Sequence, residues 1–125
     1  MTARRLRVLL VEDEVIIRKY IAATLKNHGV DVVGEAGNGD SAEQLAMEVA
    51  PDLMLMDIRL QGTRTGIDVA QTLSTRTNVP VVFMSAYDYK DRISESALPN
   101  FAGFISKPFS ESVLLREIDR FAETH

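Results

Sequence analysis

The chain has 125 residues, no cysteine and a formal net charge of −4, with 14 lysine and arginine residues against 18 aspartate and glutamate residues. This length suits one compact domain, and a hydrophobic share of 46% excludes a disordered chain. The lack of cysteine excludes disulfide frameworks, thiolate zinc sites and cysteine nucleophiles, and it agrees with a reducing cytoplasm. No apolar run approaches the ~20 residues of a membrane span, and the acidic balance disfavours nucleic acid as a direct partner.

Short apolar runs recur along the chain and are separated by polar stretches. Five of them stand out: Leu6–Val11, Val30–Val33, Leu53–Met56, Val79–Met84 and Phe101–Ile105. Several are nearly continuous, with little alternation of polar and apolar residues. This pattern is typical of strands that are covered on both faces of a parallel sheet.

Stretches with helical spacing lie between these runs. A stripe that ends with Leu25 predicts a first helix with Gly29 as its C-terminal cap. Asp40 and Glu43 indicate a capping box at the start of a second helix, and Pro51 follows its end. Apolar stripes predict three more helices. The third helix contains Ile67, Ala70 and Leu73, and the fourth, within residues 89–98, contains Ile93 and Ala97. The fifth helix begins at Ser110 and contains Leu114, Ile118 and Phe121.

Strands and helices thus alternate five times, which predicts an α/β fold with helices on both faces of a parallel sheet. Five βα units allow the flavodoxin-like three-layer sandwich with strand order 2-1-3-4-5. In that order the ligand crevice lies at the carboxyl ends of the strands. We expect a single domain over residues 1–125, with no second domain after the fifth helix.

Charged and polar residues follow the ends of four predicted strands. The first strand runs into Glu12 and Asp13, the third ends at Asp57, the fourth at Ser85 and the fifth at Lys107. The first and third strands are neighbours in the flavodoxin-like order. We therefore expect Glu12, Asp13 and Asp57 to share one pocket.

Three carboxylates in one pocket repel one another and raise each other's pKa values. A divalent cation relieves this repulsion, and Mg²⁺ prefers carboxylate, water and phosphate oxygens. By themselves, Glu12 and Asp13 are more typical of a solvated acidic rim that caps the next helix. Asp57 follows a fully apolar strand and therefore needs a partner. Lys107 is either a simple ion-pair partner of Asp57 or, with the Ser85 hydroxyl, a group that binds a phosphoryl group.

Three segments in order, Val8–Glu14, Pro51–Asp57 and Gly103–Phe109, resemble the motifs of the receiver domain of two-component response regulators. The resemblance covers essentially the whole chain. It implies that Asp57 accepts a phosphoryl group from a sensor histidine kinase or phosphotransfer protein, and that the chain is a signalling domain rather than a turnover enzyme. It also implies a downstream protein target.

The resemblance assigns roles to further residues. It implies a Mg²⁺ site made by Glu12, Asp13, Asp57 and the backbone carbonyl of Arg59. It also implies that Ser85 moves toward the new phosphoryl group, that Lys107 pairs with that group, and that the Lys107–Pro108 peptide bond is cis.

Phe104 matches the family's aromatic switch position, three residues before Lys107. It is either a switch that rotates inward when Ser85 moves or a plain core aromatic residue. Switching would change the surface of the fourth helix, fifth strand and fifth helix, through which the family also forms homodimers.

The loop after the third strand departs from the family pattern. Residues 58–66 lack the usual Met-Pro pair and reach Gly66 one residue later, which suggests a more mobile loop. The Arg59 side chain either faces the site and tunes the removal of the phosphoryl group by water, or lies in solvent. Tyr87 is a second candidate for shielding the site.

Three other functions compete with this interpretation. A pseudo-receiver would bind partner proteins regardless of phosphorylation, but the complete set of acidic residues argues against it. A flavodoxin-like module would bind an anionic flavin phosphate, which acidic strand ends repel, and no phosphate-binding loop follows the first strand. A phosphatase with an aspartate nucleophile would need a second acid two residues later, where this chain has Arg59.

Overall fold

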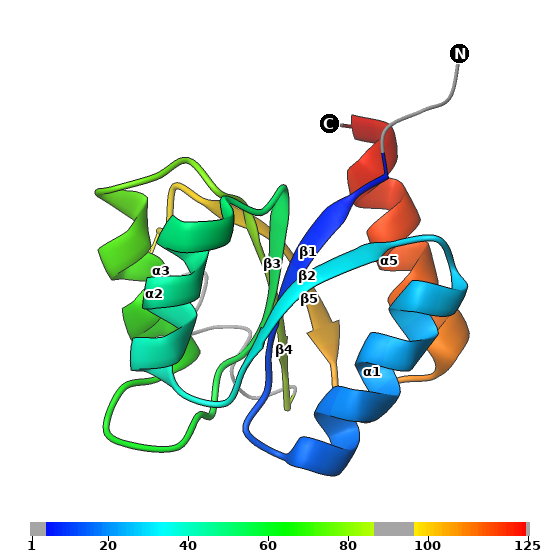
Figure 1. Ribbon diagram of the computed structural model, residues 1–125, viewed down its shortest axis with the longest axis horizontal. Coiled ribbons are helices and arrows are strands. Elements are labelled where there is room, and N and C mark those ends of the chain that lie inside the picture. Colours follow the sequence, from blue (N-terminus) through cyan, green and yellow to red (C-terminus); the bar gives the residue numbers. More distant parts are fainter. Residues whose placement is uncertain (1–4, 87–96, 125) are drawn as a thin grey trace.

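The computed structural model describes residues 5–86 and 97–124, in which strands and helices alternate along the chain (Figure 1). The elements are β1 (Arg7–Val11), α1 (Val15–Asn27), β2 (Asp31–Ala36), α2 (Gly39–Val49), β3 (Leu53–Asp57), α3 (Gly66–Ser74), β4 (Val81–Ser85), β5 (Phe101–Ser106) and α5 (Glu111–Thr124). All five predicted strands are present, and their bounds differ from the predictions by up to three residues. The fourth predicted helix lies largely outside the described residues, and Tyr87 lies outside them.

The five strands form one sheet in the order β2-β1-β3-β4-β5. Every neighbouring pair is parallel. The predicted α/β class and strand order are therefore confirmed. Each residue of β3 and β4 is buried, because helices cover both faces of the sheet at these strands.

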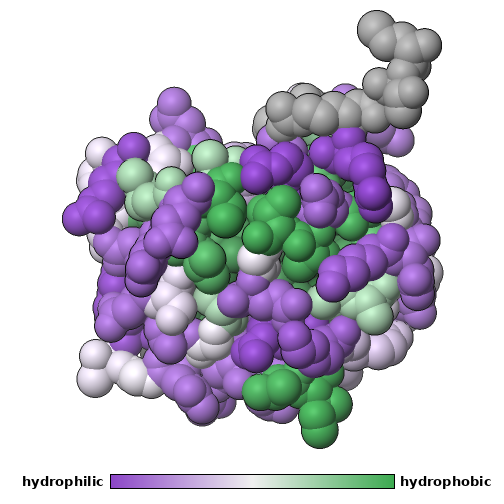
Figure 2. All heavy atoms as spheres, viewed as in Figure 1, coloured by the Kyte–Doolittle hydropathy of each residue, from purple (hydrophilic) through white to green (hydrophobic). Residues whose placement is uncertain are grey.

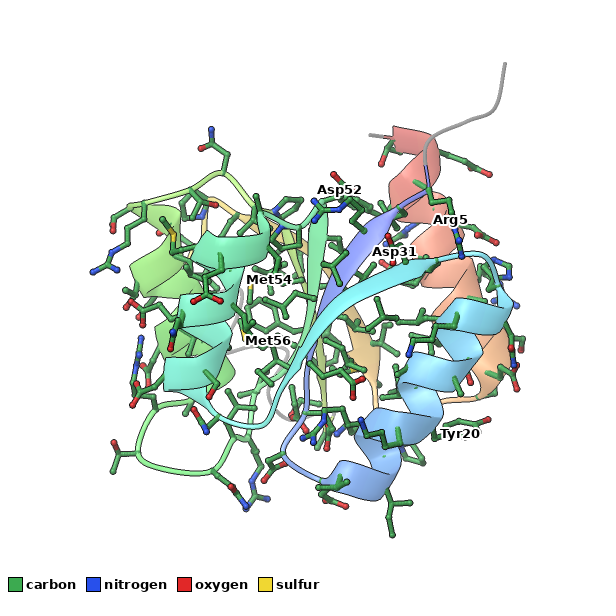
Figure 3. All side chains as sticks on the ribbon, in the orientation of Figure 1. Arg5, Tyr20, Asp31, Asp52, Met54 and Met56 are labelled. Atoms are coloured by element: carbon green, nitrogen blue, oxygen red, sulfur yellow. The ribbon has the colours of Figure 1, made fainter. Side chains whose placement is uncertain are left out.

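Two apolar layers hold the helices on the sheet. The helices α1 and α5 cover one face, and α2 and α3 cover the other (Figure 1). Alternate residues of β3 supply the two layers: Leu53 and Leu55 pack on the α1 and α5 side, whereas Met54 and Met56 extend toward α2 (Figure 3). The two methionines are fully buried core residues.

The end of α1 follows from Gly29, as the sequence predicts. Gly29 has a φ of 85°, in the left-handed region that glycine adopts at little cost. The Val30 N–H donates to the Leu25 carbonyl at 3.0 Å, and the Gly29 N–H donates to the Lys26 carbonyl at 3.1 Å. This pair of bonds is a Schellman motif, and it satisfies carbonyls that the helix end would leave without partners.

The capping box predicted for α2 from Asp40 and Glu43 is wrong. The N-cap residue is Asn38, whose side-chain oxygen accepts a hydrogen bond from the Ser41 N–H at 2.9 Å. Asn38 is the N-cap because its backbone lies in the β region, from which its short side-chain amide reaches the N–H of the third helical residue. Glu43 instead forms an ion pair with Arg64.

Among the residues described, no helix has both the length and the apolar character needed to cross a membrane.

Candidate functional site

The carboxyl ends of the strands bring the predicted site residues to one edge of the sheet. β1 and β3 pair Val11 with Met56, so the residues that follow, Glu12 and Asp57, are neighbours. On the other side of Asp57, β4 and β5 end at the same level, and the Lys107 N–H donates to the Ser85 carbonyl at 2.8 Å. The register therefore brings residues that are far apart in the chain to one edge.

Three carboxylates meet at this edge. One oxygen from each of Glu12, Asp13 and Asp57 lies within 4.8 Å of the others. Glu12 has no exposed surface and Asp57 is 5% exposed, while Asp13 is half-buried. The solvated rim is therefore wrong for Glu12. The capping role is wrong as well, because the N-cap residue of α1 is Glu14, whose side chain makes no cap hydrogen bond.

Lys107 provides the positive charge that Asp57 needs. Its Nζ donates to Asp57 Oδ2 at 2.6 Å and to Glu12 Oε2 at 2.9 Å. Burial by itself lowers the pKa of Lys107, but the hydrogen bonds to these two carboxylates outweigh burial and raise the pKa above 10.5. The ammonium group therefore stays charged at neutral pH. The Lys107–Pro108 peptide bond is cis, as the resemblance implies.

Glu12 holds its proton more tightly than an ordinary glutamate. Its pKa rises from 4.5 to about 7, first because burial disfavours the charged form and then because Asp57 lies beside it. Lys107 opposes this shift but does not cancel it. Without a cation the pocket has more carboxylate charge than Lys107 neutralises.

The backbone around Asp57 is fixed by close contacts. The Arg59 N–H donates to Asp57 Oδ1 at 3.1 Å, and the Gly66 N–H donates to the Ile58 carbonyl at 2.7 Å. A Cβ atom at Gly66 would collide with the Asp57 carbonyl oxygen. Glycine at this position thus lets the start of α3 pack directly on the backbone of Asp57. The Arg59 side chain is exposed, in agreement with the solvent alternative.

The loop over residues 58–65 contacts α2 and the residue before it, and its expected mobility stays a prediction. Gln61 forms a β-bridge with Asn38. Arg64 Nη1 lies 2.6 Å from Glu43 Oε2 and 3.1 Å from Asp40 Oδ1. Its hydrogen bond to Glu43 is the main cause of a raised Arg64 pKa.

Ser85 and Phe104, the two predicted switch residues, lie on the neighbouring strands β4 and β5. Ser85 ends β4 and is 2% exposed. Phe104 is the β5 partner of Phe83 and packs, partly buried, against the apolar layer of α2 and α3. The movement of either side chain stays a prediction.

The donor set fits Mg²⁺. Glu12, Asp13 and Asp57 offer only oxygen ligands, which hard divalent cations prefer, and two of the three side chains are buried. A cation here relieves the repulsion that raises the pKa of Glu12. The backbone carbonyl of Arg59 as a further ligand stays a prediction.

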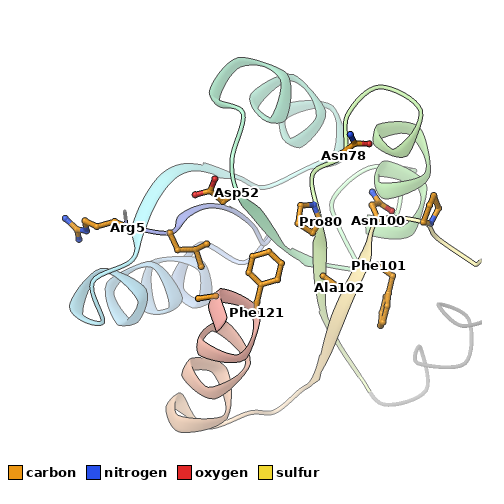
Figure 4. Close-up of a pocket in the computed structure, with 11 residues that line it drawn as sticks. Arg5, Asp52, Asn78, Pro80, Asn100, Phe101, Ala102 and Phe121 are labelled. Carbon is orange, nitrogen blue, oxygen red and sulfur yellow. The ribbon is translucent and has the colours of Figure 1, made fainter. Parts of the chain in front are cut away.

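The surface has other features that lie away from the acidic residues. A hollow of about 850 Å³ is lined by Asp52, Pro80 and Asn100, which precede β3, β4 and β5, so it opens at the amino ends of the strands (Figure 4). The face in Figure 2 mixes hydrophilic and apolar residues, and the apolar ones gather across its upper centre and in a projection at its lower edge. At the start of α1, Val15 and Ile16 are 56% and 85% exposed.

Sequence reasoning missed two features near the site. A capping box begins α3, in which Thr65 and Asp68 each accept a backbone N–H of the other. Its Thr-x-x-Asp spacing was a visible signal. Arg18 was also missed: its Nη1 donates to the Glu12 carbonyl at 2.8 Å. No local pattern marks Arg18, because the contact depends on how α1 packs beside β1.

The chain matches the family model of the response regulator receiver domain over residues 8–119. Because this match covers most of the chain, the protein belongs to the response regulator receiver family. It therefore shares the family's role in two-component signalling.

Curated relatives and solved structures agree with this assignment. The transcriptional regulatory protein PdtaR of Mycobacterium tuberculosis (strain ATCC 25618 / H37Rv) is 36% identical over 113 residues, covering 90% of this chain and 55% of PdtaR. The chemotaxis protein CheY of Thermotoga maritima is 28% identical and covers 94% of this chain and 98% of its own. The chain spans about half the length of several curated relatives, including PdtaR, LytT and YdfI.

Among solved structures, the signal receiver domain of NarL from Mycobacterium tuberculosis superposes with a TM-score of 0.86 at 26% identity, covering 98% of this chain and all of that one. The structure of PhyR from Bartonella quintana gives a TM-score of 0.81 at 25% identity, with 98% of this chain and 49% of that one covered.

Proposed function

We propose that Asp57 accepts a phosphoryl group from a phosphohistidine of a sensor histidine kinase or phosphotransfer protein. An Asp57 carboxylate oxygen attacks phosphorus, a P–O bond forms and the P–N bond breaks. The electron pair of the broken bond stays on the imidazole nitrogen, which takes up a proton. The product is an aspartyl phosphate on this chain.

One observation carries this proposal: the buried Asp57 carboxylate lies 2.6 Å from the Lys107 ammonium and shares a pocket with Glu12 and Asp13. Transfer of a phosphoryl group depends mostly on positioning and charge neutralisation. Lys107 supplies positive charge to the phosphoryl oxygens, and the Ser85 hydroxyl donates to one of them.

Glu12, Asp13 and Asp57, with the backbone carbonyl of Arg59, hold Mg²⁺. When bound, the ion neutralises the carboxylates and the oxygens of the incoming phosphoryl group. The buried carboxylates in turn keep the cation beside Asp57 and limit the access of water to it.

Phosphorylation of Asp57 changes the conformation of a protein-binding surface. Ser85 moves toward the phosphoryl group, Lys107 pairs with that group, and Phe104 rotates into the space that Ser85 leaves. The surface that responds includes β5, α5 and the fourth helix expected from the sequence, and it binds a downstream protein or a second copy of the chain. The single-domain organisation over residues 1–125 and the cytoplasmic location stay predictions.

The test is phosphorylation by a small donor. We expect acetyl phosphate with Mg²⁺ to add one phosphoryl group to the intact protein, as measured by mass spectrometry. Asp57→Asn abolishes the added mass, whereas Asp31→Asn, a matched change at an exposed aspartate at the start of β2, keeps it.

The same experiment separates this proposal from the pseudo-receiver. If neither acetyl phosphate nor beryllofluoride modifies or binds the wild-type protein in Mg²⁺, phosphotransfer is refuted and a phosphorylation-independent binding module remains. An added phosphoryl group that persists in Asp57→Asn also refutes the assignment of Asp57.

A further inference from the structure

Arg18 reaches from α1 to the turn that carries the acidic residues. Its Nη1 donates to the backbone carbonyl of Glu12 at 2.8 Å. The side chain is 17% exposed, so most of the guanidinium lies inside the protein rather than in solvent. A buried guanidinium on a backbone carbonyl makes a charge-assisted hydrogen bond, which is stronger than a neutral one.

Gly37 makes room for this guanidinium. A Cβ atom at Gly37 would lie 3.1 Å from Arg18 Nη1, closer than most Cβ contacts allow. The next atoms near that Cβ would be the Asp13 Cα and the Glu12 oxygen, both at 3.9 Å. The turns after β1 and β2 therefore approach closely, and the tip of Arg18 lies against both of them.

The ion pair of Arg18 with Glu35 does not explain its position. Arg18 Nε is 3.4 Å from Glu35 Oε1, yet this Nε is buried and has no hydrogen-bond partner among the described residues. Lys19 shares the same carboxylate at 3.2 Å. If the ion pair with Glu35 determined the position of Arg18, the buried Arg18 Nε would form a hydrogen bond with that carboxylate. The contact with Glu12 is the better-formed one.

The hydrogen bond to Arg18 completes the support of the Glu12 backbone. The Glu12 N–H donates to the Ala36 carbonyl at 2.9 Å, and the Glu12 carbonyl accepts from Arg18. The first bond fixes the peptide plane before Glu12, and the second fixes the plane between Glu12 and Asp13, from which the Asp13 side chain departs.

From this geometry we infer that Arg18 is a positioning residue for the divalent cation. Through the Glu12 carbonyl it holds Glu12 and Asp13 in the arrangement that binds the ion, and Gly37 leaves room for its guanidinium. The inference rests on the proposed function. It goes beyond that function because Arg18 acts through the backbone carbonyl of Glu12, without a direct role in binding the cation or the phosphoryl group.

The test is a Mg²⁺ titration of the full chain, monitored through the NMR chemical shifts of the Asp13 and Arg59 amides. We expect Arg18→Met to weaken Mg²⁺ binding about tenfold, as for other groups that orient metal ligands, and Arg18→Lys to weaken it less. Lys19→Met is the matched control: Lys19 pairs with the same Glu35 and is 64% exposed, and this variant keeps wild-type affinity.

Gly37→Ala gives a second, independent route to the same change. Its Cβ would lie 3.1 Å from Arg18 Nη1, so the guanidinium must shift and Mg²⁺ binding weakens, but less than in Arg18→Met. The Arg18→Met/Gly37→Ala double variant binds no more weakly than Arg18→Met alone. At saturating Mg²⁺ the rate of phosphorylation of Arg18→Met by acetyl phosphate returns to the wild-type rate. Thermal unfolding in the absence of metal shows that each variant is folded.

Three results would overturn the inference. Arg18→Met could bind Mg²⁺ within about twofold of wild type, against the expected tenfold loss. The effects of Arg18→Met and Gly37→Ala on Mg²⁺ binding could add. The phosphorylation rate of folded Arg18→Met could stay low at saturating Mg²⁺, which would mean that Arg18 does not act through the affinity for the cation. A different result, wild-type protein that is not phosphorylated in Mg²⁺, refutes the proposed function instead.

Discussion

At the residue scale, the buried Glu12 carboxyl group has an unusual dependence on pH. Its pKa is near 4.5 when unfolded and about 7 in the folded protein without metal. Below pH 4.5 both states are protonated. As pH rises toward 7 and above, the folded state must lose a proton that it holds more tightly, so this group's contribution to stability is lost.

Glu12→Gln should therefore reduce the loss of stability between pH 5 and pH 8 in metal-free protein. We expect the free energy of unfolding to fall less over this interval in the variant, by about 1–3 kcal/mol. Urea unfolding with a chelator at both pH values measures it. Glu14→Gln, a matched change at an exposed residue, leaves the pH dependence as in wild type. Equal pH dependence in wild type and Glu12→Gln would contradict this account of the pocket.

Lys107 has the opposite role, because it neutralises Asp57 and Glu12. Lys107→Met leaves these buried carboxylates without their cation and should lower the free energy of unfolding at pH 8 by about 1–3 kcal/mol in metal-free protein, less than for a fully buried pair because Lys107 is 25% exposed. Saturating Mg²⁺ should recover part of this loss by binding the folded state.

Urea titrations with and without Mg²⁺ measure both effects, and Lys26→Met at an exposed position of α1 is the control. A stability of Lys107→Met equal to that of wild type would show that the ion pairs contribute nothing net.

At the scale of elements, the junction between β3 and α3 connects the fold to the site. Gly66→Ala places a Cβ atom against the Asp57 carbonyl, so the backbone of Asp57 or the start of α3 must shift. We expect a loss of about 1–3 kcal/mol of stability, together with slower phosphorylation by acetyl phosphate.

Gly62→Ala separates these two effects. Gly62 has a φ of 94° and open space around its Cβ position, so alanine costs stability through backbone strain alone. Its phosphorylation rate should stay at the wild-type value. Equal rates for both variants would show that close packing on Asp57 does not matter for the chemistry.

The sequence predicted the strands better than the ends of the helices. β3 and β4 are fully buried, so their apolar runs are nearly unbroken and easy to recognise. β2 is an edge strand with intermediate burial, and its prediction stopped three residues early, before Gly34 and Glu35. The cap of α2 was misplaced because Asn38 and Asp40 are both good capping residues, and only the backbone conformation decides between them.

The site was predicted because it depends on topology. Once the strands are parallel, their carboxyl ends meet at one edge, and Glu12, Asp57 and Lys107 must lie there. Arg18 and the packing of Gly66 could not be predicted in the same way, since both depend on contacts between separate elements at ångström precision. Local sequence carries no signal for such contacts.

At the scale of the whole molecule, the buried sheet acts as a rigid support. Two apolar layers fix the five strands, and the register between them sets the positions of the acidic residues and Lys107 relative to Asp57. A charge added to Asp57 therefore acts on the side chains at this edge while the packed strands stay in place. In this account the response appears at the surface beyond Ser85 and Phe104.

The central claim is that Asp57 carries the phosphoryl group. The most direct test treats the protein with acetyl phosphate and Mg²⁺, reduces the acyl phosphate with borohydride and maps the product by tandem mass spectrometry. Reduction converts a phosphorylated aspartate to homoserine, which we predict at position 57 and at no other aspartate. Homoserine at another position, or a protein that acquires none, would contradict the account.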